Sequence, residues 1–312
     1  RNGYCHIVCN PLYTAYFTTE AKDRLTIIDV LTNHQPRRFL VNDEALGALE
    51  ALGLSAVRRW QAGQLPRDVL MDDTTLHALL EVHLPGLGPQ QRKWIVAATA
   101  VAAYHAALEF PVVRLLVCDD APQFTLVTEE LGLCWVHDGR HDKKLMPYVP
   151  HHQALLEDFI ARFWTYYALL LAYRKEPTPE KAGRLDGEFE TLFSTVTGYN
   201  ALDERIAKTR AKKSCLLMVL AHPEIPLHNN PAELGARARV RKRDVSFGPR
   251  TRDGAKAWDT FMTLVETATK LGVSFYHYIH DRVSGASQMP SLADLIEERA
   301  KLLNLGASWN TS

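Results

Sequence analysis

The chain lacks three features that would each point to a particular class of protein: long uncharged apolar segments, a disulfide pattern and a net charge. Its longest uncharged apolar runs, residues 94–108 and 163–173, are shorter than the roughly 20 residues that a membrane-spanning helix needs. The five cysteines are odd in number and irregularly spaced, which argues against a disulfide framework and favours a reducing compartment. The first residues show no basic region leading into a long apolar one, so no signal peptide is predicted. We therefore expect a soluble cytoplasmic protein with no membrane partner.

Charge is balanced over the whole chain but not along it. The 312 residues include 36 Lys and Arg and 36 Asp and Glu. Between Arg205 and Arg252, however, twelve basic residues occur with three acids, an excess of nine that the rest of the chain offsets. A basic surface for a polyanion and an ordinary solvated helix surface explain this asymmetry equally well. Five of the cations cluster in one predicted helix, residues 230–243: Arg237, Arg239, Arg241, Lys242 and Arg243.

Four short segments have strand-like composition. Residues 4–10 and 13–20 are rich in β-branched and aromatic residues and predict two neighbouring antiparallel strands. Residues 111–120 form an apolar run that ends in two acids, which predicts a buried central strand, and residues 131–137 predict another. Residues 23–31 fit either a strand or a short helix, because their apolar spacing does not decide.

The remaining chain has mostly helical patterns, so the sequence predicts an α/β core with large all-helical insertions. The aromatic stripe of residues 154–174 favours core packing of a helical bundle over a role in base stacking. The predicted parts are core strands in 1–42, a helical insertion in 43–108, further core in 109–150, a second helical insertion in 151–222, and a core helix followed by C-terminal helices in 223–312.

Three acids are candidates for a metal site. Asp119 and Asp120 follow the predicted buried strand, where α/β sheets place their sites, and Glu233 could face them from a later helix. Mg²⁺ prefers oxygen ligands and usually takes one or two carboxylates from the protein. The alternative is that Glu233 forms an ordinary ion pair with Arg237, four residues further along the helix.

A second metal-like pattern is Cys134, His137 and His141 in CWVHDGRH. This spacing could hold zinc, but structural zinc sites have four ligands, and no fourth follows at the expected short spacing. His151 and His152 are nearby in the sequence. The alternative is a buried cysteine beside surface histidines.

Three motifs, taken together and in order, resemble DDE transposases of the insertion sequence sixty-six family. HNNPAE, followed by the Arg-rich helix, resembles the family's Asn-Asn-x-Ala-Glu motif, whose Glu is the last catalytic acid. This match assigns that role to Glu233. LLVCDDAPQF resembles the strand of the second catalytic acid, and the spacing to Phe124 selects Asp119. The resemblance extends from about residue 4 to residue 282.

The third motif, LCWVHDGRHDKKL, resembles the family's Cys-Trp-x-His strand. It places Cys134, Trp135 and His137 on the next strand of the sheet and weakens the zinc interpretation. The family's first catalytic Asp lies on the first strand of its RNase H-like sheet. No match to that strand is present, since the Asp-Asp-Thr at residues 72–74 falls in a helical insertion. We therefore expect this Asp upstream of Arg1 and the present chain to be inactive as it stands.

The resemblance implies an RNase H-like mixed sheet and a DNA transposase that cleaves and joins DNA strands. It implies two Mg²⁺ ions, with Mn²⁺ as an alternative, held by Asp119 and Glu233. Its partners would be double-stranded DNA, both element ends and target, and further copies of the same chain assembled on that DNA. Such a protein would act in the bacterial cytoplasm, at the nucleoid.

The cations of the basic helix then acquire a role as phosphate contacts, which position DNA without reading its sequence. Arg237 and Arg241 lie on the helical face of Glu233 and are the strongest candidates. Asn229 and Asn230 would cap the helix or orient Glu233, and capping is favoured. Two alternatives stay open: a non-catalytic DNA-binding protein derived from a transposase, and an RNase H-like metal-dependent nuclease acting on RNA or branched DNA.

Overall fold

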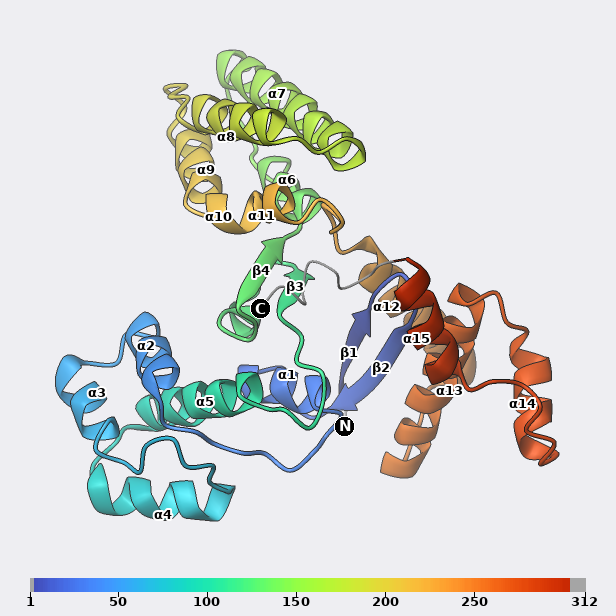
Figure 1. The fold of residues 1–312 in the computed structure, drawn as a ribbon. Coiled ribbons are helices and arrows are strands. Elements are labelled where there is room, and N and C mark those ends of the chain that lie inside the picture. Colours follow the sequence, from blue (N-terminus) through green and yellow to red (C-terminus); the bar gives the residue numbers. More distant parts are fainter. Residues whose placement is uncertain (1–2, 304–312) are drawn as a thin grey trace. The chain divides into compact units, whose positions relative to one another are not determined.

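The computed structural model describes residues 3–303 (Figure 1). The chain forms two compact units. The first unit is drawn from Arg1–Thr26 and Asn230–Ser312, and the second is Ile27–Asn229. Both contain a two-stranded sheet and several helices, so the predicted mixed α/β class with extensive helical regions is confirmed. No helix of the described chain is both long enough and apolar enough to cross a membrane.

The sheet of the first unit is an antiparallel hairpin, as the sequence predicted. Strand β1 (Tyr4–Cys9) pairs with β2 (Thr14–Thr19), and Tyr4 lies opposite Thr19. The connection is tight because Asn10 Oδ1 accepts hydrogen bonds from Leu12 N at 2.8 Å and from Tyr13 N at 2.9 Å. Side-chain acceptors of this kind stabilise short turns between strands.

Four helices complete the first unit: α12 (Asn230–Ser246), α13 (Arg252–Lys270), α14 (Phe275–Val283) and α15 (Leu292–Leu302). Helix α13 covers the outer edge of β2 through side chains spaced four residues apart. Asp259, Thr263 and Thr267 accept hydrogen bonds from backbone N–H groups of β2, at 2.6, 3.0 and 3.3 Å. An exposed strand edge invites pairing with other chains, and this ladder blocks it.

Helix α12 packs on β1 at a glycine. A side chain at Gly235 would place its Cβ 3.0 Å from Tyr16 Oη and 3.3 Å from Ile7 Cγ2. Tyr16 Oη donates a hydrogen bond to the backbone oxygen of Gly235 at 3.3 Å. The glycine therefore lets the helix that carries Glu233 lie close to the hairpin.

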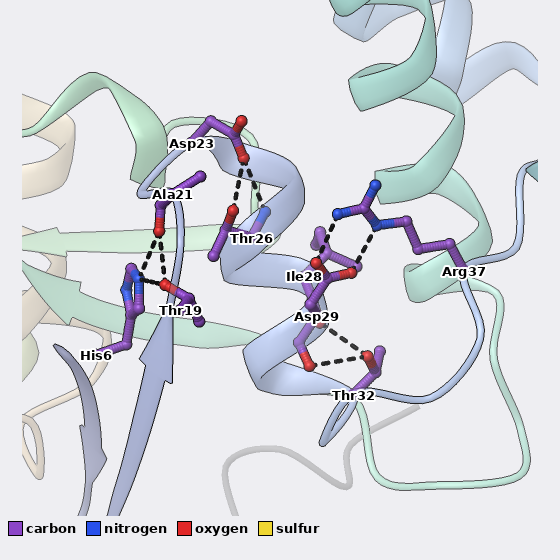
Figure 2. A network of polar contacts seen from close by, with 9 residues as sticks. All are labelled: His6, Thr19, Ala21, Asp23, Thr26, Ile28, Asp29, Thr32 and Arg37. Carbon is purple, nitrogen blue, oxygen red and sulfur yellow. Dashed lines mark hydrogen bonds and ion pairs between the residues drawn. The ribbon is translucent and has the colours of Figure 1, made fainter. Parts of the chain in front are cut away.

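Helix α1 (Arg24–Leu31) settles the ambiguity of residues 23–31, and the boundary between the two units falls inside it. Figure 2 shows the polar contacts along it. Asp23 Oδ1 accepts from Thr26 N at 3.0 Å and thereby caps the helix start. Near the other end, Arg37 forms a bidentate pair with Asp29, with distances of 2.7 and 2.6 Å. Such local hydrogen bonds favour helix over strand where apolar spacing is indecisive.

The prediction that residues 43–108 are mostly helical is confirmed. It comprises α2 (Asp43–Ala51), α3 (Ala56–Ala62), α4 (Asp73–His83) and α5 (Pro89–His105). Asn42, Ser55 and Asp72 cap the first three with side-chain oxygens. The Asp-Asp-Thr at 72–74 is therefore a helix start. Helix α5 is buried from residue 95 to residue 104, which explains its Ala-rich composition.

The sheet of the second unit is parallel. Strand β3 (Leu115–Cys118) pairs with β4 (Glu130–Leu133), and a short 3₁₀ turn, η1 (Pro122–Phe124), lies between them. The prediction of a strand over residues 131–137 is wrong beyond Leu133. Cys134 caps α6 (Trp135–Asp142), because its sulfur accepts from His137 N at 3.3 Å.

The second helical region, 151–222, is also helical. Its elements are α7 (Pro150–Lys175), α8 (Pro179–Phe193), α9 (Asn200–Arg210), α10 (Lys213–Leu216) and α11 (Met218–Ala221). Trp135 is fully buried in this bundle against Phe163, Tyr166, Phe189 and Phe193. The aromatic stripe of α7 is thus core packing, as favoured from the sequence, and burial of Trp135 explains why the strand gives way to a helix there.

Candidate metal and DNA-binding residues

Asp119 directly follows the last residue of β3. The neighbouring backbone is held by a hydrogen bond of 2.9 Å from Cys134 N to Cys118 O. Asp119 Oδ1 is buried, and no group of the described chain donates a hydrogen bond to it. Buried carboxylate oxygens normally have partners, because leaving one unpaired in the interior is costly. An oxygen in this state suits a ligand atom for a cation.

Asp120 has a different environment from its neighbour. Its carboxylate forms an ion pair with Lys212, and the same ammonium lies 3.2 Å from Asp138 Oδ1. Asp120 is therefore engaged by the protein itself, whereas Oδ1 of Asp119 has no hydrogen-bond partner among residues 3–303. This difference favours Asp119 as the ligand, in line with the assignment made from the spacing to Phe124.

Lys212 also contacts a buried cluster of charged side chains that was not predicted from the sequence. Asp138 and Asp142, on α6, are 3% and 2% exposed, and Arg205 lies 2.5 Å from the first and 3.4 Å from the second. Thr209 Oγ1 donates to Asp138 Oδ2 at 2.7 Å. Burial raises the pKa of Asp142 to about 7; Arg205 opposes this shift and Asp138 adds to it. Two acids four residues apart in DGRHD were the available sequence signal.

Cys134 links three segments at the end of the sheet. Its backbone N–H reaches Cys118, and its sulfur accepts from the backbone N–H groups of His137 and Asn229, at 3.3 and 3.4 Å. Cys134, Trp135 and His137 thus lie at a helix start, and the prediction that they continue a strand is wrong.

His137 stacks edge-on against His141, with ring centroids 5.1 Å apart. Burial lowers the pKa of His141, and nearby Arg205 acts in the same direction. Within residues 3–303, no group of three or more His, Cys, Asp or Glu side chains could hold a metal ion. The zinc alternative for Cys134, His137 and His141 therefore has no support from their arrangement. A magnesium site needs only one or two carboxylates from the protein, because water and substrate phosphate complete its coordination.

Asn229 does not act as the predicted helix cap. A capping asparagine accepts a backbone N–H through its side-chain oxygen. Asn229 Oδ1 is buried and accepts no hydrogen bond from the residues that the structure describes. Asn230 is the first residue of α12. The capping prediction for Asn229 is therefore wrong, and its oxygen needs another explanation.

Glu233 lies in the first turn of α12, where the helix dipole favours negative charge. Its side chain is 25% exposed, and Oε2 lies 3.9 Å from Arg237 Nη2. This is the ion pair foreseen as the alternative role, but the separation is longer than a charge-assisted hydrogen bond. The structure thus shows the alternative role of Glu233, an i, i+4 ion pair with Arg237.

Arg239 differs from the other cations of α12. It is 8% exposed and forms an ion pair with Asp259, at 2.5 Å. The same guanidinium donates to Thr18 Oγ1 and lies 4.5 Å from the ring centre of Trp258. It therefore fastens α12 to β2 and α13 and is not presented to a DNA backbone. Four cations of α12 remain exposed: Arg237, Arg241, Lys242 and Arg243.

Acids from other parts of the chain offset much of the basic excess found between Arg205 and Arg252. Lys212 contacts Asp120 and Asp138, and Lys213 lies 2.9 Å from both Asp186 and Glu190. Arg205 is paired with buried acids, as described above. The cations before α12 are thus largely matched by acids from other segments, so the exposed side of α12 is the better candidate for a polyanion.

The two predicted metal-binding acids belong to different units: Asp119 to the second and Glu233 to the first.

No family model matches the chain, and no solved structure matches it. Among curated proteins, the chain is similar to the "uncharacterized protein y4jO" of Sinorhizobium fredii (strain NBRC 101917 / NGR234). The two are 32% identical over 301 residues, which cover 92% of this chain and 89% of the relative. Similarity of this extent covers both units and the segments that carry Asp119 and Glu233. The chain therefore belongs to the same protein family as this Sinorhizobium fredii protein.

Proposed function

We propose that the chain is a DDE-type DNA transposase with an RNase H-like core, which cleaves DNA and joins the liberated strand to a target. The observation that carries the proposal is the buried, unpartnered oxygen of Asp119 at the carboxyl end of a parallel strand. That end of an α/β sheet is the usual place for a ligand. The order of the three motifs that resemble the insertion sequence sixty-six family adds independent support.

The strand pairing is consistent with parts of an RNase H-like sheet. The outer edge of β2 is hydrogen-bonded by α13, and Trp135 N, just beyond β4, donates to Leu227 O at 3.0 Å. In contrast, β1 pairs with β2 alone and β3 with β4 alone among the strands of residues 3–303. One edge of β1 and one edge of β3 thus pair with no other strand among residues 3–303.

Asp119 and Glu233 would hold Mg²⁺, with Mn²⁺ as an alternative ion. The donor set fits, because both are carboxylates and hard divalent cations prefer oxygen. When bound, such ions activate the attacking group and stabilise charge at the phosphate. The protein's own contribution is to hold Asp119 at the end of β3 and Glu233 on the first turn of α12, which packs against β1 through Gly235.

The exposed cations of α12 would contact the DNA backbone. Arg237 and Arg241 follow Glu233 by four and eight residues, so they lie near its helical face. Their side chains can reach phosphates while Arg239 holds the helix in place from its buried side. Such contacts position DNA and make binding salt-dependent. Assembly of several copies on DNA is part of the same proposal.

The test is a cleavage and strand-transfer assay with the natural full-length protein and DNA that carries the element ends. We expect Asp119→Asn and Glu233→Gln each to abolish cleavage while DNA binding is retained. Asp244→Asn, which removes an exposed acid from the same helix as Glu233, serves as the control and should cut normally. The double variant should weaken Mn²⁺ binding by less than the sum of the two single effects, because both acids would hold the same ions.

Other outcomes distinguish the two alternatives. Cleavage without joined products would identify a metal-dependent nuclease of the same fold. DNA binding without any cleavage by the full-length protein would identify a non-catalytic DNA-binding protein. Normal cutting by Asp119→Asn or Glu233→Gln would reject the assignment of both acids.

A further inference from the structure

Asn229 carries another buried side-chain oxygen that has no partner among residues 3–303. Asn229 Oδ1, like Asp119 Oδ1, is fully shielded from solvent and accepts no hydrogen bond within the described part of the chain. We infer that Asn229 supplies this oxygen to the divalent cation that Asp119 holds. The inference rests on the proposed function and adds a neutral ligand to its site.

The backbone of Asn229 is held at the same end of the small sheet as Asp119. Its N–H donates to the sulfur of Cys134, and the N–H of Cys134 donates to the oxygen of Cys118. Asp119 is the next residue in the chain. Two hydrogen bonds through Cys134 therefore connect Asn229 to the residue that precedes the proposed metal ligand, all within the second unit.

The backbone on both sides of this link is also fixed. Trp135 N donates to Leu227 O at 3.0 Å, and the Trp135 ring donates through Nε1 to Leu216 O at 2.8 Å. Leu227 is 2% exposed. A buried anchor two residues before Asn229 and the hydrogen bond from its own N–H to Cys134 fix the backbone from which this side chain extends.

A neutral oxygen has a chemical advantage at this position. Carbonyl oxygens of asparagine are accepted ligands of hard divalent cations. Unlike a further carboxylate, an amide adds no negative charge, so it does not repel the DNA phosphate that must approach the same ion. Asparagine can thus complete the coordination of the ion while leaving its positive charge available to the substrate.

The experiment measures Mn²⁺ binding to the DNA-free protein by electron paramagnetic resonance titration, so it does not depend on cleavage activity. We expect Asn229→Ala to weaken Mn²⁺ binding by about tenfold or more. Asn229→Asp should bind Mn²⁺ at least as tightly as the natural protein, because it keeps the oxygen and adds charge. Asn200→Asp, at an exposed position on α9, is the matched control and should leave affinity unchanged.

The variants separate failure of this inference from failure of the proposed function. If Asp119→Asn loses Mn²⁺ and Asn229→Ala does not, the role of Asn229 is rejected and the proposed function stands. If Asp119→Asn binds Mn²⁺ as the natural protein does, the proposed metal site itself is rejected. If Asn229→Ala fails to fold, Asn229→Asp serves as the test, because aspartate has nearly the same shape as asparagine. Weaker Mn²⁺ binding by Asn229→Asp than by the natural protein would overturn the inference. Weaker DNA binding with unchanged Mn²⁺ affinity would assign Asn229 to a phosphate contact and would also overturn it.

Discussion

Lys212 forms an ion pair with Asp120, the residue that follows the proposed metal ligand Asp119. The same ammonium contacts the buried Asp138 on α6. One cation therefore fastens the end of β3 to the helical bundle of its unit. Asp119 lies between Asp120, which Lys212 holds, and the buried Cys118. We therefore expect the position of Asp119 to depend on the charge of Lys212.

Replacement of Lys212 by Gln is expected to lower the affinity for Mn²⁺ as well as the stability. The change leaves Asp120 without its cation and removes one partner of Asp138, so we expect a loss of about 1–2 kcal/mol in the free energy of unfolding. Urea denaturation and Mn²⁺ titration measure the two effects. Lys208→Gln, at an exposed position on α9 four residues before Lys212, is the control and should change neither the stability nor the Mn²⁺ affinity. Unchanged Mn²⁺ affinity in Lys212→Gln would show that the ion pair does not position Asp119.

Arg239→Ala is expected to destabilise the first unit by about 3 kcal/mol, since it leaves the Asp259 carboxylate largely buried without its cation. It also removes the guanidinium from the face of Trp258. Arg239→Lys should recover only part of this loss, because an ammonium cannot reproduce the planar contacts to Asp259 and Thr18. Chemical denaturation measures both. Full stability of Arg239→Ala with weakened DNA binding would instead make Arg239 a DNA contact.

Arg241→Ala, unlike Arg239→Ala, is expected to weaken DNA binding and to leave stability nearly unchanged. Its side chain is exposed, so stability should change by less than about 0.5 kcal/mol. Loss of one phosphate contact should weaken DNA binding for all sequences and reduce the slope of log K against log salt by about one. Lys301→Ala, on α15, removes an exposed charge from another helix and should leave the slope unchanged. The same slope in both variants would remove Arg241 from the proposed DNA surface.

The pH dependence of stability should report on Asp142. Burial raises the pKa of this acid to about 7 in the folded protein, well above the value of 3.8 for an unperturbed aspartate. Between these values the folded state binds the proton and the unfolded state does not, so the contribution of Asp142 to stability falls as pH rises through this window. Asp142→Asn removes this titration.

We therefore expect the stability of Asp142→Asn, relative to the natural protein, to be greater at about pH 8 than at about pH 5. Urea denaturation at both pH values measures the difference. Asp158→Asn, an exposed position on α7, is the control and should follow the natural protein. Parallel pH profiles for Asp142→Asn and the natural protein would mean that Asp142 is already ionised at the lower pH.

The local elements were largely predictable because their signals are local. Alternating β-branched and aromatic residues predicted the hairpin of β1 and β2, and the apolar run before Asp119 predicted β3. The end of β4 was not predictable, because residues 131–137 have strand-like composition. The turn to helix at Cys134 depends on burial of Trp135 in a bundle formed by α7 and α8.

The sequence by itself determined where most strands and helices lie, which acids follow the buried strand, and that α12 is rich in cations, since each depends on neighbouring residues. Only the tertiary structure decided which charges are available to a ligand. Arg239 is removed from the candidate DNA surface by Asp259, 20 residues away, and Lys212 is held by Asp138, 74 residues away. The physical reason is that burial and ion pairing depend on distance in space, which separation along the chain does not reveal.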